Sequence, residues 1–268
     1  MGLVDDLIGD VILDGIHYLY FKWKNNKRAK LFDAFAREHG LSFSATVADY
    51  HGEIMQIKVP SSAELKSQGH KRLSRKAKHA SRLYGDSPFQ TKLWAFVTNR
   101  HRGDWQSNYN ISEGTWNGRL VTSFDTLWFD GGASDEGEYT SVFAHCKGDV
   151  PQVIMSPGGA TSFFKKLEED QMFNRGYHRQ QFESAEFNQA WHVTSVDQRL
   201  ASDFISQEMM EYLLEHKDVR WSIELSPGGV LVSSVYSLSP TQVKLLMDFL
   251  TGLLEHIDKD LLRSLDQQ

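Results

Sequence analysis

The residues with the clearest capacity for chemistry in this sequence are basic, and they gather between positions 58 and 102. That segment holds eleven Lys and Arg residues against Glu64 and Asp86, a net charge of +9. The whole chain has 29 basic and 35 acidic residues, so the remainder carries 18 and 33, a net charge of −15. The chemistry that such a segment offers is the binding of anionic groups.

One stripe of these cations has the spacing of a helix. Lys71, Arg75, Lys78 and Arg82 follow one another at i, i+4, i+7 and i+11, which places them on one helical face. The candidate anion-binding or partner-binding residues are Lys71, Arg72, Arg75, Lys76, Lys78 and Arg82. Near an anionic membrane each cation contributes about 1 kcal/mol, so the four-residue stripe gives about 4 kcal/mol, a millimolar-scale affinity. A helix face that is simply solvated is the alternative.

The other reactive residue types lack the spacing that their chemistry requires. The histidines form no H-E-x-x-H motif, the single Cys146 excludes a thiolate zinc site, and the sequence has no glycine-rich phosphate loop. His145 and Cys146 are neighbours on a predicted strand, so their side chains point to opposite faces and cannot pair as base and nucleophile. The acidic run 130–138 lacks the ligand spacing of an EF-hand and is interpreted as a solvated loop. We therefore assign no catalytic residue and expect no metal, nucleotide or other cofactor.

Two helices are predicted before the first strand. Residues 3–24 form an amphipathic pattern, whose candidate residues for self-association or docking are Leu7, Val11, Ile12, Ile16 and Leu19. Its aspartates lie toward the N-terminal end and its cations toward the C-terminal end, the arrangement that the helix dipole favours. These cations are Lys22, Lys24, Lys27 and Arg28. A second helix, or a continuation, is expected to stop at Gly40. The predicted organisation is an N-terminal helical segment 1–40, then a single domain 41–268 with a basic helical insertion at about 61–85.

The rest of the chain predicts an α+β fold. Ile111–Trp116 and Arg119–Trp128 flank Asn117-Gly118, a pair typical of a type I′ hairpin turn, and a second hairpin surrounds residues 227–229. Residues 99–110 are interpreted as an irregular polar stretch. Ser239-Pro240 is expected to open a long final helix. Because the strands come in hairpins and the helices in separate runs, we expect a mainly antiparallel sheet covered by helices.

Over roughly residues 110–262 the chain resembles a bacterial family of uncharacterised proteins. The resemblance rests on the hairpin around 114–119, the block 182–188, the helix around 209–214, and a strand pair before the closing helix. Many members of that family carry an N-terminal membrane-spanning segment, where this chain has a charged amphipathic helix. The resemblance implies no activity and no catalytic residues.

The composition favours a folded protein in the cytoplasm or at the inner membrane surface. The chain has 268 residues, 40% of them hydrophobic, and Asp5 and Asp6 stand where a signal peptide is basic. We expect a non-enzymatic binding protein that contacts a protein partner, or another copy of itself, through the basic helix 61–84 and the N-terminal helix. The alternatives are an anionic membrane surface, a nucleic acid, or an enzyme whose site is assembled from distant segments.

Overall fold

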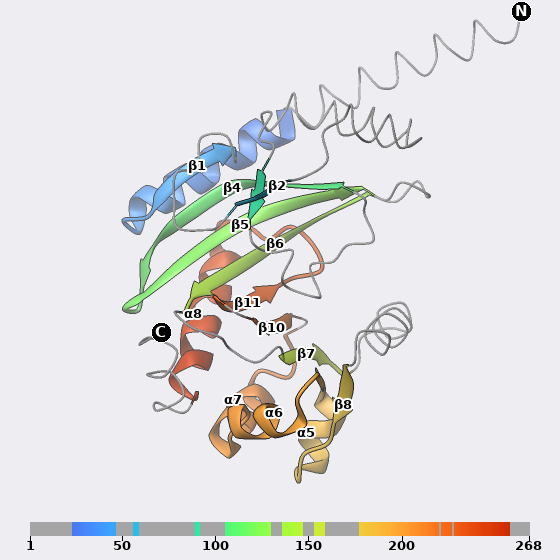
Figure 1. The fold of residues 1–268 in the computed structure, drawn as a ribbon. Helices are drawn as coiled ribbons and strands as arrows, with labels where there is room; N and C mark the ends of the chain where they lie inside the picture. The colour runs from blue at the N-terminus through green and yellow to red at the C-terminus, as the bar shows by residue number, and fades with distance from the viewer. Residues whose placement is uncertain are drawn as a thin grey trace, which may run out of the picture.

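The chain folds into one large antiparallel sheet with helices packed against it, which confirms the predicted α+β class (Figure 1). The computed structural model describes residues 23–46, 56–58, 89–91, 105–129, 136–146, 153–158, 177–219, 221–226 and 228–257. The helices are residues 23–38, α5 (Ala185–Ala190), α6 (Gln198–Phe204), α7 (Gln207–Glu215) and α8 (Pro240–Glu255). The strands are β1 (Ser42–Thr46), β2 (Gln56–Lys58), β3 (Phe89–Thr91), β4 (Trp105–Trp116), β5 (Arg119–Phe129), β6 (Glu136–His145), β7 (Val153–Pro157), β8 (His178–Gln180), β9 (Trp191–Ser195), β10 (Ser222–Ser226) and β11 (Gly229–Ser233).

Nine strands pair in the order β1-β4-β5-β6-β11-β10-β7-β9-β8. β2 and β3 form a separate antiparallel pair, in which Lys58 and Phe89, the residues that flank segment 59–88, are direct partners. The predicted basic helical insertion at 61–85 falls inside that segment and therefore outside the described residues. Its existence as a helix stays a prediction.

The central hairpin has the turn that its sequence predicts. Asn117 and Gly118 have φ angles of 47° and 78°, the positive values that a type I′ turn requires. β4 begins at Trp105, so the prediction of an irregular stretch is wrong from there to Asn110. The pairing with β5 shifts register between Tyr109 and Ser112, and Asn110 has a φ of 50°. This bulge breaks the two-residue alternation by which a strand is recognised in a sequence.

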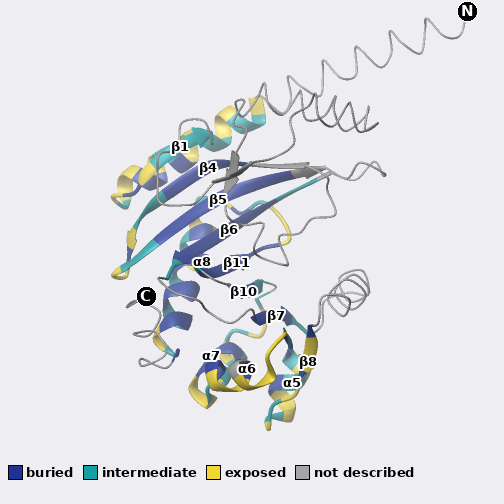
Figure 2. Cartoon of the chain, in the orientation of Figure 1, coloured by how far each residue is buried: buried dark blue, intermediate teal, exposed yellow. Residues whose placement is uncertain are grey.

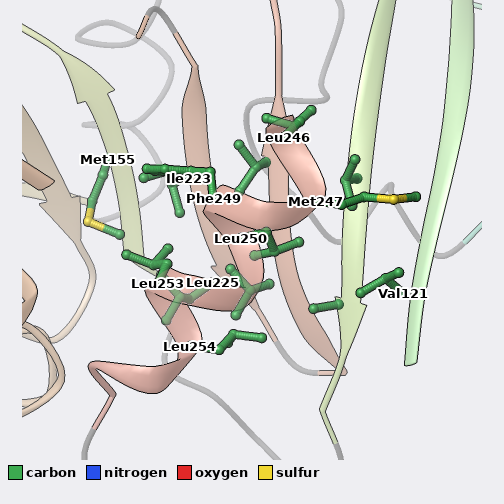
Figure 3. Packing of buried hydrophobic residues seen from close by; sticks show 14 of the residues in the cluster. Val121, Met155, Ile223, Leu225, Leu246, Met247, Phe249, Leu250, Leu253 and Leu254 are labelled. Carbon is green, nitrogen blue, oxygen red and sulfur yellow. The ribbon is translucent and has the colours of Figure 1, made fainter. Parts of the chain in front are cut away.

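The two faces of the sheet differ in what covers them. Residues directly opposite one another on paired strands share a face, which places Val121, Val142 and Val232 on one side, named here the helix-covered face. Thr122 and Phe143 lie on the opposite face. α8 packs its buried stripe onto the helix-covered face, with Leu250 among the side chains that meet the strands (Figure 3).

α8 confirms the predicted final helix. Ser239 caps its N-terminus, Pro240 opens it, and Gln242 completes a capping box with Ser239. Each of its buried apolar side chains contributes about 1.5–3 kcal/mol when it leaves water. They are Val243, Leu246, Met247, Phe249, Leu250, Leu253 and Leu254.

The helix 23–38 packs on the same face as α8 and shares its core. Phe32, Phe35 and Ala36 are buried there, whereas the outer side of the helix is exposed (Figure 2). Gly40, at a φ of 70°, follows the helix and leads into β1, as predicted. In the part of the chain that the structure describes, no helix has the length and apolar character needed to cross a bilayer.

Candidate functional site

A buried ion pair joins Arg28 of the helix 23–38 to Asp125 of β5. The Arg28 Nε lies 2.6 Å from Asp125 Oδ2, and Nη2 lies 2.7 Å from Oδ1, a bidentate arrangement. The Asp125 side chain is fully buried, and that of Arg28 is 16% exposed. The alternation along β5 places Asp125 on the helix-covered face, directly across from Thr140 of β6.

The same carboxylate is held by two further donors. Thr140 Oγ1 donates to Asp125 Oδ1 at 2.6 Å, and Asn110 Nδ2 donates to Oδ2 at 2.9 Å. Arg28 Nη2 also donates to the carbonyl oxygen of Leu238, at 2.6 Å, just ahead of α8. Burial acts to lower the pKa of Arg28, but the hydrogen bond and charge of Asp125 raise that pKa above its ordinary value. The network thus ties the helix 23–38 to three strands and to the entry of α8.

A second, more exposed ion pair lies one helical turn earlier. Lys24 Nζ is 2.6 Å from Glu138 Oε2, and Ser237 Oγ is 3.4 Å from the same oxygen. Glu138 belongs to β6, so the prediction that the acidic run 130–138 is a solvated loop is wrong at its C-terminal end. The body of the protein therefore neutralises both Lys24 and Arg28.

The outer side of the same helix carries a different set of residues. Trp23 is 62% exposed and Leu31 is 52% exposed, and Lys27 lies between them with its Nζ 5.7 Å from the centroid of the Trp23 ring. Positions 23, 27 and 31 follow at i, i+4 and i+8 and so form one stripe. Lys30 is exposed beside it. This outer stripe of Trp23, Lys27, Lys30 and Leu31 combines bulky apolar surface with two cations.

The opposite face of the sheet holds a compact acid–base cluster on three neighbouring strands. Thr122 Oγ1 on β5 lies 2.8 Å from Glu113 Oε2 on β4 and 2.8 Å from His145 Nε2 on β6. His145 Nε2 is 3.7 Å from Glu113 Oε2. The single hydroxyl proton of Thr122 cannot serve both neighbours, so when it is donated to Glu113 the His145 Nε2 must carry a proton and donate to Thr122.

This cluster joins a carboxylate to an imidazole through one hydroxyl. Within the described residues, no group of three or more His, Cys, Asp or Glu side chains is placed to hold a metal ion. Further along the same face, Thr126 donates to Asn108 Oδ1 at 2.8 Å, and burial raises the pKa of Tyr139 well above its ordinary value. The polar side chains of this face are thus engaged with one another.

None of the residues predicted to form contact sites falls in the described part of the chain. The basic candidates Lys71, Arg72, Arg75, Lys76, Lys78 and Arg82, and the docking candidates Leu7, Val11, Ile12, Ile16 and Leu19, all lie outside it. Cys146 does lie inside and packs against the apolar core, while His145 bonds to Thr122 on the other face. The predicted separation of these two neighbours is therefore confirmed.

Two residues of the buried network were accessible to sequence reasoning but were missed. The position of Arg28 predicts only a cation that suits the helix dipole, whereas in the structure Arg28 forms a specific ion pair with Asp125. Asp125 stands in the middle of a strand between Phe124 and Leu127, and a charge in such a position needs a buried partner. That mid-strand charge was the available signal, although the identity of its partner required the fold.

Comparison with known proteins leaves the family open. No family model and no curated protein matches the chain. Among solved structures, it is similar to the crystal structure of the mycobacterial trehalose monomycolate transport factor A, TtfA, with 11% sequence identity and a TM-score of 0.44. The alignment covers 84% of this chain and 93% of that chain. A likeness at this level does not establish a shared function, and the family resemblance seen in the sequence stays a prediction.

Proposed function

We propose that this chain is a non-enzymatic binding protein that docks on an anionic membrane surface through its basic and amphipathic N-terminal elements. The observation that supports the proposal is the outer stripe of the helix 23–38, where Trp23 and Leu31 are more than half exposed beside Lys27. Tryptophan suits the boundary between lipid and water because its ring is apolar and its N–H is polar. Lysine beside it suits the negative surface of such a membrane.

A protein partner is the competing occupant of this stripe, and composition weighs against it. Protein–protein interfaces are depleted in lysine and enriched in arginine. The helix 23–38 has two arginines: Arg28 is paired internally with Asp125, and the exposed Arg37 is paired with Asp33 of the same helix. The cations of the outer stripe, Lys27 and Lys30, are both lysines. Self-association through residues 3–24, and nucleic-acid binding through the basic segment, are retained as alternative outcomes of the test below.

The expected affinity follows from adding the two contact elements. Lys27 and Lys30 supply about 2 kcal/mol, and burying the exposed halves of Trp23 and Leu31 supplies about 2 kcal/mol more. The predicted stripe at 71, 75, 78 and 82 supplies about 4 kcal/mol. Acting together they give about 8 kcal/mol, a micromolar-scale affinity, whereas each element alone is millimolar in scale.

The test is co-sedimentation of the full chain with anionic and neutral vesicles over a salt series. We expect binding to the anionic vesicles that weakens as salt increases, and that is reduced by the double substitution Lys27→Glu and Lys30→Glu. The matched control is Arg199→Glu with Lys217→Glu, which makes the same change of charge at exposed positions on α6 and after α7. Equal loss of binding in both variants would mean that only net charge matters and that the outer stripe is not the contact.

The alternatives have distinct outcomes in the same experiment. Binding to DNA or RNA in gel shifts, with none to vesicles, would replace the membrane by a nucleic acid. Concentration-dependent dimers that the substitution Trp23→Ser dissociates would assign the stripe to self-association. Binding to no anionic surface at low salt would refute the proposal.

An enzyme assembled from distant segments is the second candidate, and the contact that favours it is the Glu113–Thr122–His145 cluster. A histidine held beside a carboxylate is a general acid–base arrangement. The test is a panel of ester and phosphoester substrates with the wild type and His145→Gln. Turnover that disappears in the variant would support catalysis, whereas background rates in both proteins would exclude it for these substrates.

A further inference from the structure

Three buried polar atoms on the helix-covered face have no hydrogen-bond partner among the described residues. They are Asn110 Oδ1, Ser112 Oγ and Ser123 Oγ, and all three residues are fully buried. A buried polar atom that gives up its contact with water and gains no partner lowers the stability of a fold, so each such atom requires an explanation.

The orientation of the Asn110 amide is fixed by its neighbour. Its Nδ2 lies 2.9 Å from Asp125 Oδ2. Asp125 is ion-paired with Arg28 and therefore only accepts hydrogen bonds, so the amide must present its NH₂ group to it. Exchanging the amide atoms would not satisfy Oδ1, because it would set two acceptors against each other. The unpaired oxygen is thus a property of the site.

The three atoms belong to one patch of two neighbouring strands. Ser112 of β4 and Ser123 of β5 are directly paired, so their side chains stand on the same face with Cβ atoms about 4.5–5.5 Å apart. Asn110 sits on the bulge immediately before Ser112, and Asp125 follows Ser123 by two residues on the same face. The pairing and the bulge therefore make these two hydroxyls and the amide oxygen neighbours on one face of the sheet.

We propose that this patch binds one ordered water molecule, held by Ser112 Oγ, Ser123 Oγ and Asn110 Oδ1. A buried water typically makes about three hydrogen bonds to groups that would otherwise be unsatisfied, and this patch supplies three. The water donates to the amide oxygen, which can only accept, and its remaining bonds go to hydroxyls, which can donate or accept. It thereby extends the polar network of Arg28 and Asp125 beneath the helix 23–38.

The crystal structure of the full chain, at a resolution that shows ordered solvent, is the direct test. We expect density within hydrogen-bond distance of all three atoms. A direct hydrogen bond between the two serines, or a site that is dry, would overturn the proposal.

Urea unfolding of Ser112→Ala, Ser123→Ala and the double variant is the second measurement. With a shared water, each single substitution raises the unfolding equilibrium constant about fivefold, and the second adds less than the first because the water has already lost a partner. A dry site predicts the opposite sign, since each substitution then removes an unsatisfied hydroxyl and stabilises the fold. The control is Ser141→Ala with Ser233→Ala, a buried serine pair whose hydroxyls bond directly at 2.7 Å on the opposite face.

Discussion

Replacing Arg28 by Met is expected to destabilise the fold far more than a single hydrogen bond would. The substitution keeps most of the side-chain length but leaves Asp125 fully buried with only the neutral donors Thr140 and Asn110. Breaking a buried pair by removing one partner costs about 3–5 kcal/mol, because the remaining charge is uncompensated. That loss is comparable to a large part of the total stability of an ordinary domain.

The matched control is Lys24→Met on the same helix. The Lys24 side chain is 41% exposed and that of its partner Glu138 is 13% exposed. Because water reaches the ammonium group, this pair contributes about 0–1 kcal/mol to the free energy of unfolding. The free energy of unfolding of each variant is measured by urea unfolding of the full chain, with circular dichroism as the signal. Adding Asp125→Leu to Arg28→Met is expected to restore part of the loss, because it removes the charge that the first substitution left unpaired. Equal costs for Arg28→Met and Lys24→Met, or no rescue in the double variant, would refute the reasoning.

Four further outcomes are expected. Gly118→Ala should cost about 1–2 kcal/mol in urea unfolding through backbone strain alone, because φ is 78° there and an added Cβ meets no atom within 4 Å. Gly229→Ala should cost more, since its Cβ would collide with the Ala144 carbonyl oxygen on β6. Ser239→Ala should lower stability by about 1 kcal/mol through loss of the α8 capping box, and Ser239→Asp should retain most of it. Burial raises the pKa of Tyr212 in the folded protein to about 12, whereas in the unfolded chain this phenol ionises near pH 10. The free energy of unfolding should therefore fall as the pH rises from 10 to 12. Tyr212→Phe should remove that part of the pH dependence.

Local patterns predicted local structure well in this chain. The Asn117-Gly118 turn, the stop at Gly40 and the cap at Ser239 each depend on a few adjacent residues whose backbone preferences are strong, and all three are present. The extension of β4 back to Trp105 was missed, because the bulge at Asn110 breaks the alternation that marks a strand.

The contacts that form the candidate sites could not be predicted in the same way. Arg28 and Asp125 are 97 residues apart, and His145 meets Glu113 only because β4, β5 and β6 are neighbours in one register. No local pattern encodes which strand lies beside which. The sequence could therefore reveal that Asp125 needs a partner, but only the pairing of the strands and the packing of the helix 23–38 identify that partner.

The two sets of cations on the helix 23–38 depend on each other through its rotation about its own axis. At 100° per residue, Lys24 and Arg28 point about 100° away from Trp23 and Lys27. Because Arg28 is fixed on Asp125 by two hydrogen bonds, the helix cannot roll, and Trp23 and Lys27 are held toward solvent. A buried ion pair adds little net stability compared with apolar packing, but the two parallel hydrogen bonds of a bidentate pair are directional. Its contribution to the proposed docking surface is therefore orientation, which an apolar contact of the same size would not fix as sharply.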